Sequence, residues 1–504
     1  MSMNLMIQGT MSNVGKSIIT AALCRIFKQD GYRVAPFKSQ NMALNSAITP
    51  DGKEMGRAQV VQAQAAGIVP DVRMNPILLK PMKDTGSQVI VNGHPIGNYS
   101  ASDYFRMKRD LIPDILKAYH ELEQEYDIIV IEGAGSPVEI NLKAEDIVNM
   151  GMAKMVDAPV VLVGDIDPGG VFAQLYGTTE LLEEEEKSRL IGTVINKFRG
   201  DPGLLEPGVT MIEDLTGVPV LGVVPYQKLS IDDEDSMARV LNCKKTDKMF
   251  DVAVIRLPHI SNFTDFDPLS VHPLMGVRYV ESAEELGTPD LIILPGTKNT
   301  IEDLCWLRES GLESVILNRI DAGTLTLGVC GGYQMLGEMI SDPCGIESGG
   351  EIRGLGKLPV RTVFDREKIQ ENVTGICASC GRETANVSGY LIHMGRSFKT
   401  REDAGDFCVL DGLGADGCVC KNVYGTYLHG LFDSGELILR FADLIAQQKG
   451  ISVLEEEVVT HYEAQEKELD KLADAVRAAL DLERIYDAMR SYEKRRRKEN
   501  YATS

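Results

Sequence analysis

Short apolar runs that end in a polar or glycine-containing turn recur along the whole sequence. They cover residues 3–8, 128–131, 159–164, 191–195, 252–257, 291–294 and 325–329. Unbroken runs of this length are typical of parallel strands that are buried on both faces. Segments with helical spacing lie between them, as at residues 18–26. The pattern therefore predicts an α/β protein with two doubly wound parallel-sheet domains.

A polar and basic stretch at residues 240–250 separates two groups of apolar runs. We therefore expect a first domain over residues 1–245 and a second over residues 246–450, since domains run to roughly 100–200 residues each. Residues 451–504 are charged with helical spacing, which predicts an appended helical tail. Weakly patterned insertions are expected in the second domain at residues 366–385 and 400–420.

The first predicted strand runs into a glycine-containing loop, residues 9–17, of sequence Gly-Thr-Met-Ser-Asn-Val-Gly-Lys-Ser. A strand, such a loop and a following helix predict a phosphate cradle of backbone N–H groups, in which Lys16 reaches the terminal phosphates. The Ser17 hydroxyl is a candidate Mg²⁺ ligand. Glu132, at the end of a later strand, is a second candidate ligand. For Glu132 an ordinary strand-terminal carboxylate is the alternative. We expect ATP and Mg²⁺, and no tightly bound organic cofactor.

A second motif predicts covalent chemistry. Cys330 follows the apolar run 325–329 and precedes two glycines and a helical segment. That arrangement is the sequence form of a nucleophile elbow, in which the start of the next helix favours the thiolate. His429 stands at the end of another apolar run, so the two side chains can meet as a thiol–imidazole pair. The alternative for Cys330 alone is a buried core thiol.

Charge and composition narrow the classes of partner. The net charge of −22 argues against nucleic acid or an anionic membrane as a partner. No signal peptide and no membrane-spanning apolar stretch is expected, which predicts a cytoplasmic protein. The ten cysteines are then interpreted as reduced thiols. Those at residues 377–420 are expected to be surface thiols, with a zinc site as the alternative. The basic run at residues 494–498 is interpreted as a solvated helix end.

The loop at residues 9–17, with Thr10 where the common phosphate loop has Gly, resembles the dethiobiotin synthetase group of P-loop NTPase-like proteins. That resemblance implies nucleotide contacts from the loop and from the base-recognising pair Asn196 and Lys197. The implied nucleotide-binding residues are Thr10, Gly15, Lys16, Ser17, Asn196 and Lys197.

The Cys330 elbow resembles the glutaminase site of class I glutamine amidotransferases. There the Cys forms a thioester with glutamine and releases ammonia, and the His relays protons. The resemblance implies that Gln334 holds the glutamine and that the turns at Gly296 and Gly331 line the oxyanion site. Many members carry Glu two residues after the His. Here that position is Leu431, as in the cobyrinate-type subclass, so no residue is assigned to orient His429.

Across about 450 residues the chain resembles the cobyric acid synthase family, most particularly at residues 36–46 and 165–170. The resemblance implies ATP-dependent amidation of the b, d, e and g carboxylates of adenosylcobyrinic acid a,c-diamide, with glutamine as the nitrogen source. It also implies that Asp146 lies near the acyl-phosphate chemistry; a helix cap is the alternative for this carboxylate. Leu391 departs from the family, which usually has Glu there. The candidate acceptor-binding residues are Lys38, Gln40, Asn41 and Arg57.

Two other functions stay open at this point. One is an amidoligase for a different carboxylate, such as cobyrinic acid or a cell-wall precursor. The other is an ATPase that uses the phosphate loop only to switch partners, which would need no thiol–imidazole pair. An oligomer is possible in each case.

Overall fold

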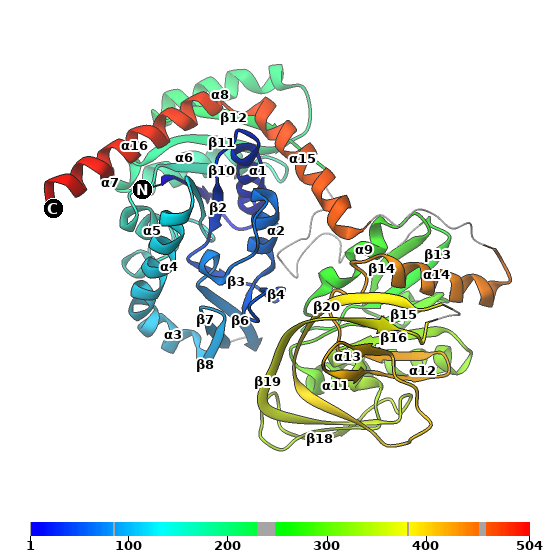
Figure 1. Ribbon diagram of the computed structural model, residues 1–504. Helices are drawn as coiled ribbons and strands as arrows, with labels where there is room; N and C mark the ends of the chain where they lie inside the picture. Colours follow the sequence, from blue (N-terminus) through cyan, green and yellow to red (C-terminus); the bar gives the residue numbers. More distant parts are fainter. Residues whose placement is uncertain (1, 84–85, 229–246, 381–382, 453–459, 504) are drawn as a thin grey trace. The chain divides into compact units, whose positions relative to one another are not determined.

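The computed structural model describes residues 2–83, 86–228, 247–380, 383–452 and 460–503, and these form two compact units (Figure 1). The first unit comprises Met1–Met42, Lys53–Ile231 and Gln465–Ser504; the second comprises Ala43–Gly52 and Asp232–Ala464. The sequence pattern predicts continuous domains and an appended helical tail. In the structure the C-terminal residues join the first unit, and a short N-terminal segment joins the second.

The first unit is built on a sheet of six parallel strands with β1 inside it. In spatial order they are β12 (Val220–Pro225), β11 (Leu190–Phe198), β10 (Val160–Asp165), β1 (Met3–Gly9), β9 (Ile128–Glu132) and β2 (Val34–Phe37). Every residue of β1, β9 and β10 is buried, because helices cover both faces. This confirms the predicted α/β class.

The two faces of this sheet carry separate cores, since successive side chains of a strand point to opposite sides. Leu5 and Ile7 enter one core and Met6 enters the other. The first core receives α1 (Lys16–Gln29), α2 (Arg57–Ala66), α15 (His461–Ala479) and α16 (Leu482–Thr503). The second receives α4 (Ile112–Glu125), α5 (Met150–Met155), α6 (Val171–Leu181) and α8 (Pro202–Thr216).

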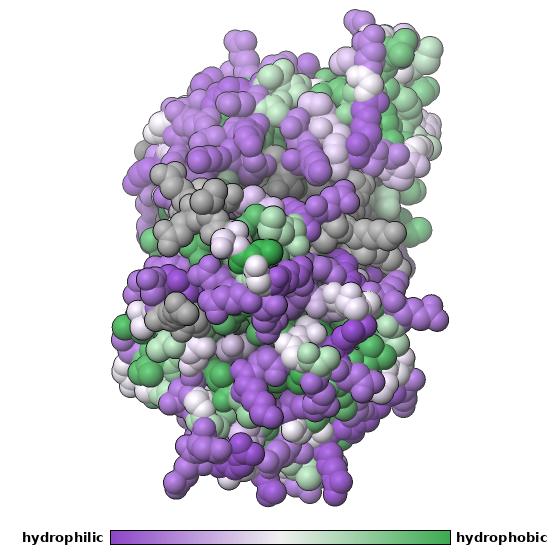
Figure 2. Space-filling view, turned by 90° about the vertical axis from the view of Figure 1, so that its right-hand side faces the viewer, coloured by the Kyte–Doolittle hydropathy of each residue, from purple (hydrophilic) through white to green (hydrophobic). Residues whose placement is uncertain are grey.

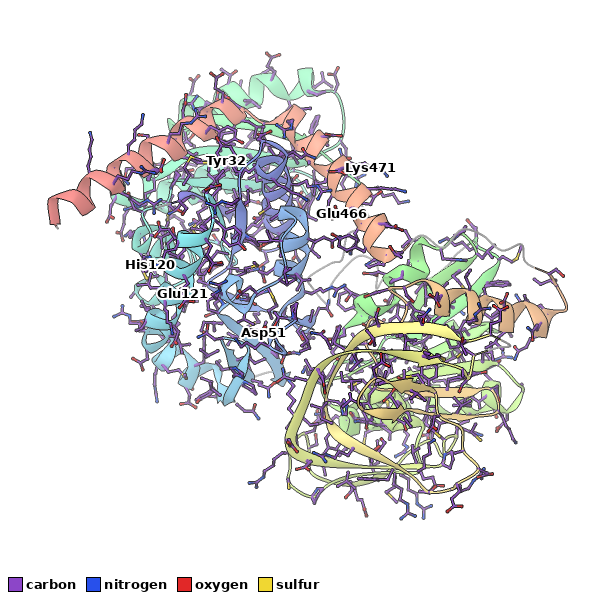
Figure 3. The ribbon with its side chains drawn as sticks, in the orientation of Figure 1. Tyr32, Asp51, His120, Glu121, Glu466 and Lys471 are labelled. Atoms are coloured by element: carbon purple, nitrogen blue, oxygen red, sulfur yellow. The ribbon has the colours of Figure 1, made fainter. Side chains whose placement is uncertain are left out.

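The C-terminal helices are part of the first unit and not a free tail. Leu469, Leu472, Ala473 and Val476 follow the i, i+3, i+4, i+7 spacing of one helix face, and all four are buried in the core around α1. In Figure 3, Glu466 lies on the side of α15 toward α1, where it pairs with Arg25 at 2.8 Å; Lys471 lies on the outer side.

The basic run of α16 corrects a second expectation. Arg496 is buried and donates to the Glu123 carboxylate at 2.8 Å and to the carbonyl of Ser2. Arg495 pairs with Asp157. The run at residues 494–498 is therefore not a plain solvated helix end, because two of its guanidinium groups find carboxylates of the same unit.

A smaller sheet and its helices complete the first unit. Its strands, in order, are β3 (Gln40–Met42), β6 (Ile77–Lys83), β7 (Gly86–Val91) and β8 (His94–Ser100). β8 leads into α3 (Ala101–Met107), whose N-cap is Ser100: its hydroxyl accepts from the N–H of Asp103 at 3.2 Å. Of two further short strands, β5 (Glu54–Gly56) belongs to the first unit and β4 (Ser46–Ile48) belongs to the second.

The second unit has its own six-stranded sheet, parallel except for one edge strand. Its order is β14 (Met275–Val280), β13 (Phe250–Ile255), β15 (Leu291–Leu294), β16 (Leu325–Val329), β24 (Val423–Thr426) and the antiparallel β23 (Cys418–Cys420). Its helices are α9 (Asp267–Val271), α10 (Ala283–Leu286), α11 (Thr300–Glu309), α12 (Leu312–Asp321), α13 (Gly331–Leu336) and α14 (Glu436–Lys449).

The expected insertions of the second domain are strands. β19 (Val360–Cys377) pairs over most of its length with β20 (Ala385–Lys399), and both belong to a mixed sheet. The other strands of that sheet are β17 (Met339–Asp342), β18 (Gly350–Arg353), β21 (Cys408–Leu410) and β22 (Gly414–Asp416). The ends of β19 do alternate between buried and exposed residues, but its middle is polar, which hides the period-two signal.

The surface of the protein is largely polar on the side drawn in Figure 2, with small scattered apolar patches. In the described parts of the chain, no helix combines the length and apolarity needed to cross a membrane. The expectation of surface thiols at residues 377–420 is wrong for four of these cysteines, because Cys377, Cys380, Cys408 and Cys418 are buried in the core. No group of three or more His, Cys, Asp or Glu residues among the described ones is arranged to hold a metal.

Candidate functional site

Cys330 occupies a strained turn between β16 and α13. Its backbone has φ 52° and ψ −108°, a region that non-glycine residues rarely adopt and that costs about 1–3 kcal/mol. Gly332 makes the turn possible, since a Cβ there would lie 1.9 Å from the carbonyl oxygen of Leu294. The predicted nucleophile elbow is therefore present in the backbone geometry. The Cys330 sulfur lies 3.9 Å from the Ile392 carbonyl oxygen.

Cys330 and His429 meet in a buried triad with Asp265. The Cys330 thiol lies near enough to His429 to help raise the pKa of the imidazole, and the Nδ1 of His429 lies 2.6 Å from the Asp265 carboxylate. The other oxygen of Asp265 accepts from the N–H of Gly430 at 3.1 Å. Since Nδ1 faces the carboxylate, Nε2 is the nitrogen available to the thiol. A base held in one orientation by a carboxylate is the arrangement that activates a nucleophile.

Electrostatics in this triad favour a charged imidazole. Burial by itself lowers the pKa of His429, but the charge of Asp265 and the hydrogen bonds to Asp265 and Cys330 outweigh burial and raise that pKa to about 10. An imidazolium beside the sulfur stabilises a thiolate. The site therefore places a positive charge beside the Cys330 sulfur.

Asp265 is the functional residue that sequence reasoning missed. It lies 164 positions before His429, in the 3₁₀ helix η5 (Phe263–Phe266), which follows Asn262 in the left-handed conformation at φ 51°. Leu431, at the position where many amidotransferases carry Glu, is fully buried in the core. The carboxylate thus comes from a different element. The sequence signal was an acidic residue among aromatic ones, which by itself points to no site.

Gln334 is buried four residues after the nucleophile and is held by polar side chains. Its side-chain oxygen accepts from the Thr300 hydroxyl at 3.0 Å, and its nitrogen donates to the Tyr427 hydroxyl at 3.3 Å. A Cβ on Gly296 would lie 3.2 Å from Cε1 of His429, and one on Gly331 would lie 3.1 Å from the backbone nitrogen of Thr297. The structure thus brings the five residues predicted from the amidotransferase resemblance, Cys330, His429, Gln334, Gly296 and Gly331, to one place.

A second buried histidine, His393, lies against Tyr427 and stays neutral. The His393 ring stacks on Tyr427 with centroids 3.7 Å apart, and its Nδ1 lies 2.7 Å from the Gly395 carbonyl oxygen. Burial is the main cause that lowers the pKa of His393 to about 4, and the nearby His429 adds to it. The two histidines therefore differ in charge at neutral pH, and only His429 carries the proton next to the thiol.

The phosphate loop follows β1 in the first unit. Gly15 has φ 97° at the N-terminus of α1, and a Cβ there would collide with the Asn196 amide at 2.2 Å. The buried Lys16 ammonium donates to the carbonyls of Met11 and Gly135 at 2.9 and 3.2 Å. The Thr10 hydroxyl donates to Gln174 at 3.0 Å. These bonds fix the conformation of the loop, with the Lys16 ammonium placed between the Met11 and Gly135 carbonyls.

Glu132 lies opposite this loop, as the sequence predicts. Its carboxylate accepts from the Ser17 hydroxyl at 2.8 Å, from the Lys38 ammonium at 2.9 Å and from the Gln62 amide at 2.5 Å. Hard oxygen ligands of this kind suit Mg²⁺, which binds through one or two protein groups together with phosphates. Ser17 and Glu132 therefore fit the metal that a nucleotide would bring.

The pair Asn196 and Lys197 closes the other side of the loop. Asn196 donates its amide to the Val14 carbonyl at 2.8 Å, and the Lys197 ammonium donates to the Asn13 carbonyl and to Asp165, both at 2.6 Å. All the predicted nucleotide-binding residues are thus gathered where β1, β9, β10 and β11 end. In open α/β sheets this is the edge that binds ligands.

The candidate acceptor-binding residues are more dispersed than the nucleotide-binding residues. Lys38 is buried and paired with Glu132, so the structure places it beside the phosphate loop. Gln40 accepts from the Tyr104 hydroxyl at 2.5 Å, and Asn41 donates to Gln59 at 3.0 Å. Arg57 begins α2 and is half-buried. Their use by an acceptor remains a prediction.

Asp146 is engaged entirely with backbone in the described structure. One oxygen accepts from the N–H groups of Val148 and Asn149, both at 2.9 Å, and the other accepts from Gly151 at 2.8 Å. These bonds match the helix-cap alternative, because they satisfy N–H groups at the start of α5. A role near the acyl phosphate remains a prediction.

Comparison with known proteins identifies the family. Residues 5–239 match the CobQ/CobB/MinD/ParA nucleotide binding domain, and residues 251–437 match the CobB/CobQ-like glutamine amidotransferase domain. A cobyric acid synthase of Lachnoclostridium phytofermentans is 54% identical over 97% of this chain and 99% of its own length. The chain belongs to the cobyric acid synthase family. Members from Ruminiclostridium cellulolyticum and Clostridium acetobutylicum are 53% and 52% identical, each over 96% of the chain.

Membership of the cobyric acid synthase family agrees with the two half-sites. The nucleotide-binding match covers the phosphate loop and Glu132, and the amidotransferase match covers Cys330, His429 and Asp265. The relatives span both units and the C-terminal helices. The predicted family and enzyme class are thereby confirmed, as is the use of ATP and glutamine.

Proposed function

We propose that this protein amidates the b, d, e and g carboxylates of adenosylcobyrinic acid a,c-diamide to give adenosylcobyric acid in cobalamin biosynthesis. Each step would consume one ATP and one glutamine. The observation that carries the proposal is the buried Cys330–His429–Asp265 triad in the same chain as a complete phosphate loop. A switch ATPase has no use for such a triad.

The glutaminase half-reaction follows from the triad. The Cys330 thiolate would attack the side-chain amide carbon of glutamine, and N–H groups at the Gly296 and Gly331 turns would stabilise the developing oxyanion. His429 gives a proton to the departing nitrogen, so that ammonia leaves and a thioester remains. His429 then takes a proton from water, which attacks the thioester and releases glutamate. Asp265 keeps Nδ1 protonated throughout, so that proton transfer always passes through Nε2.

The synthetase half-reaction follows from the phosphate loop. A carboxylate does not exchange its oxygen for ammonia, because oxide is a poor leaving group. Transfer of the γ-phosphoryl group from ATP gives an acyl phosphate, from which phosphate leaves when ammonia attacks. Lys16 and the loop N–H groups position the phosphates and offset their charge. Mg²⁺, when bound at Ser17 and Glu132, would supply further charge neutralisation between the phosphates.

Variants of single half-sites test this assignment. Cys330→Ala should abolish amidation with glutamine and leave amidation with ammonium chloride, since ammonia bypasses the thioester. Lys16→Ala should abolish amidation with either nitrogen source and leave glutamine hydrolysis measurable. Loss of ammonia-dependent amidation in a folded Cys330→Ala protein would contradict the assignment of ammonia release to Cys330 and of amidation to the phosphate-loop site. If the wild type fails to amidate the a,c-diamide but amidates cobyrinic acid or a cell-wall precursor, the proposed acceptor is wrong and that other carboxylate is the substrate.

A further inference from the structure

Helix α2 carries two buried glutamines, Gln59 and Gln62, among alanines and valines. Their residues are 0% and 1% exposed. Because they are three positions apart, the two amides lie on the same side of the helix. α2 packs beside α1 (Figure 1), whose first turn carries Ser17. Neither glutamine belongs to the phosphate loop or to a strand end, so the burial of these amides needs another explanation.

Gln62 is bound to the candidate metal ligand Glu132. Its side-chain nitrogen donates to Oε2 of the Glu132 carboxylate at 2.5 Å and lies 3.5 Å from the Ser17 carbonyl oxygen. The other carboxylate oxygen, Oε1, accepts from the Ser17 hydroxyl at 2.8 Å and from the Lys38 ammonium at 2.9 Å. Gln62 therefore restrains one oxygen of Glu132 and leaves the other facing Ser17.

The side-chain oxygen of Gln62 is an unused acceptor. It is buried and has no hydrogen-bond donor among the residues that the structure describes. Its position is defined, since the amide nitrogen must be the atom that faces the carboxylate. Burying an amide oxygen without a donor destabilises a folded protein, and the water molecules that a bound Mg²⁺ usually keeps are such donors. One amide thus offers a donor to the metal ligand and an acceptor to water on the metal.

We propose that Gln62 is a positioning residue for Glu132 and thereby for the Mg²⁺ that accompanies ATP. The inference rests on the proposed Mg²⁺ site at Ser17 and Glu132 and not on the identity of the acceptor. Gln62 raises the affinity for the metal by holding the Glu132 carboxylate in one orientation. It makes little contribution to nucleotide binding without metal. Loss of a side chain that orients a metal ligand typically weakens metal binding 10- to 100-fold.

The test measures the Kd of β,γ-imido-ATP for the full-length protein by calorimetry, once in excess Mg²⁺ and once in EDTA. Gln62→Met keeps the approximate size of the side chain and removes both polar atoms. Gln59→Met is the matched control, because it makes the same change at a buried glutamine of α2 whose oxygen accepts from Asn41 at 3.0 Å. Glu132→Gln removes the charge of the candidate metal ligand itself.

We expect Gln62→Met to raise the Kd in Mg²⁺ by roughly 10-fold or more and to leave the Kd in EDTA unchanged. Gln59→Met should change neither value. In a Glu132→Gln background, Gln62→Met should cost clearly less than in the wild type, since two residues that act together are not additive. These readouts separate a positioning role from a purely structural one, which would weaken nucleotide binding in EDTA as well.

Four results would overturn the inference: an unchanged Kd in Mg²⁺ for Gln62→Met, an equal loss in EDTA, an equal effect of Gln59→Met, or the same loss in the Glu132→Gln background. The Mg²⁺ site is tested separately. If the wild type binds the nucleotide equally in Mg²⁺ and in EDTA, or if Glu132→Gln keeps the full effect of Mg²⁺, the site at Ser17 and Glu132 is wrong and the inference falls with it. If Glu132→Gln loses that effect and Gln62→Met does not, only the role of Gln62 is refuted.

Discussion

Replacing Asp265 by Asn tests whether this carboxylate orients His429. The substitution keeps the shape of the side chain but removes its charge. An Asn amide can donate to Nδ1 and so favour the tautomer that carries its proton on Nε2. That tautomer cannot accept the proton of the Cys330 thiol. We therefore expect kcat/KM for glutamine to fall while the fold is retained.

The size of the expected fall in kcat/KM follows from the buried hydrogen bond between Asp265 and His429. Asp265 and His429 are 4% and 2% exposed in their side chains and 2.6 Å apart. A hydrogen bond to a charged group contributes about 1.5–3 kcal/mol. Since about 1.4 kcal/mol is a factor of ten in rate, kcat/KM should fall by roughly 10- to 150-fold.

The pH dependence gives a second readout with a definite sign. In the wild type the pKa of His429 is raised from its ordinary 6.5 to about 10, so the imidazolium persists until the pH rises through about 10. Its contribution to stability is likewise complete below pH 6.5 and is lost as the pH rises through 10. In Asp265→Asn, burial is no longer opposed by the carboxylate. The alkaline limb of kcat/KM should therefore move to lower pH.

The assay is release of glutamate from glutamine between pH 6 and pH 10, with ammonia-dependent amidation as the control for an intact synthetase site. Asp290→Asn serves as the matched substitution, because it removes an ion pair with the partly exposed Lys449 in the same unit. Such a pair contributes about 0–1 kcal/mol. Wild-type kcat/KM and an unmoved alkaline limb in a folded Asp265→Asn protein would refute the triad.

Three further predictions concern the first unit. Lys16→Ala should reduce ATP-dependent amidation by at least about 100-fold, since removing one preorganised charge-stabilising donor costs roughly 10²–10³ in kcat; a smaller loss measured with saturating ammonia would contradict its place at the phosphates. Leu472→Ala removes a side chain of α15 that is 1% exposed, so the unfolding free energy should fall by about 2–5 kcal/mol, as measured by urea titration. Lys471→Ala, on the exposed side of α15, should change the unfolding free energy little. Arg57→Ala should raise the KM for the corrinoid several-fold without changing the KM for glutamine, and an equal effect of Arg33→Ala, which removes an exposed ion pair, would refute a specific acceptor contact.

Short contiguous sequence patterns were enough to predict the local geometry of the phosphate loop and of the Cys330 elbow. The phosphate loop and the elbow each depend on contiguous residues between a strand and a helix, so their geometry follows from short-range constraints such as the positive φ of Gly15 and the close approach at Gly332. The strand ends that carry Glu132 and Asn196 follow from the same logic, because parallel strands bring their carboxyl ends to one edge.

Long-range contacts account for what the sequence did not predict. Asp265 reaches His429 across 164 positions, and no spacing rule links a 3₁₀ helix to a strand end so far away. The C-terminal helices look polar on average, yet one narrow stripe that includes Leu472 is buried against α1. Segment Ala43–Gly52 has no sequence pattern that assigns it to the second unit. It joins that unit through long-range contacts, such as the bond from the Tyr390 hydroxyl to the Ser46 carbonyl and the packing of Ile48 against Tyr390.

The most direct test of the central claim is mass spectrometry of adenosylcobyrinic acid a,c-diamide incubated with the wild-type protein, ATP and glutamine. The account predicts four successive products, each formed by replacing one hydroxyl with an amino group. It also predicts that Cys330→Ala yields the same products only when ammonia replaces glutamine. Glutamine hydrolysis by the wild type with no change in the mass of the corrinoid, under either nitrogen source, would contradict the account.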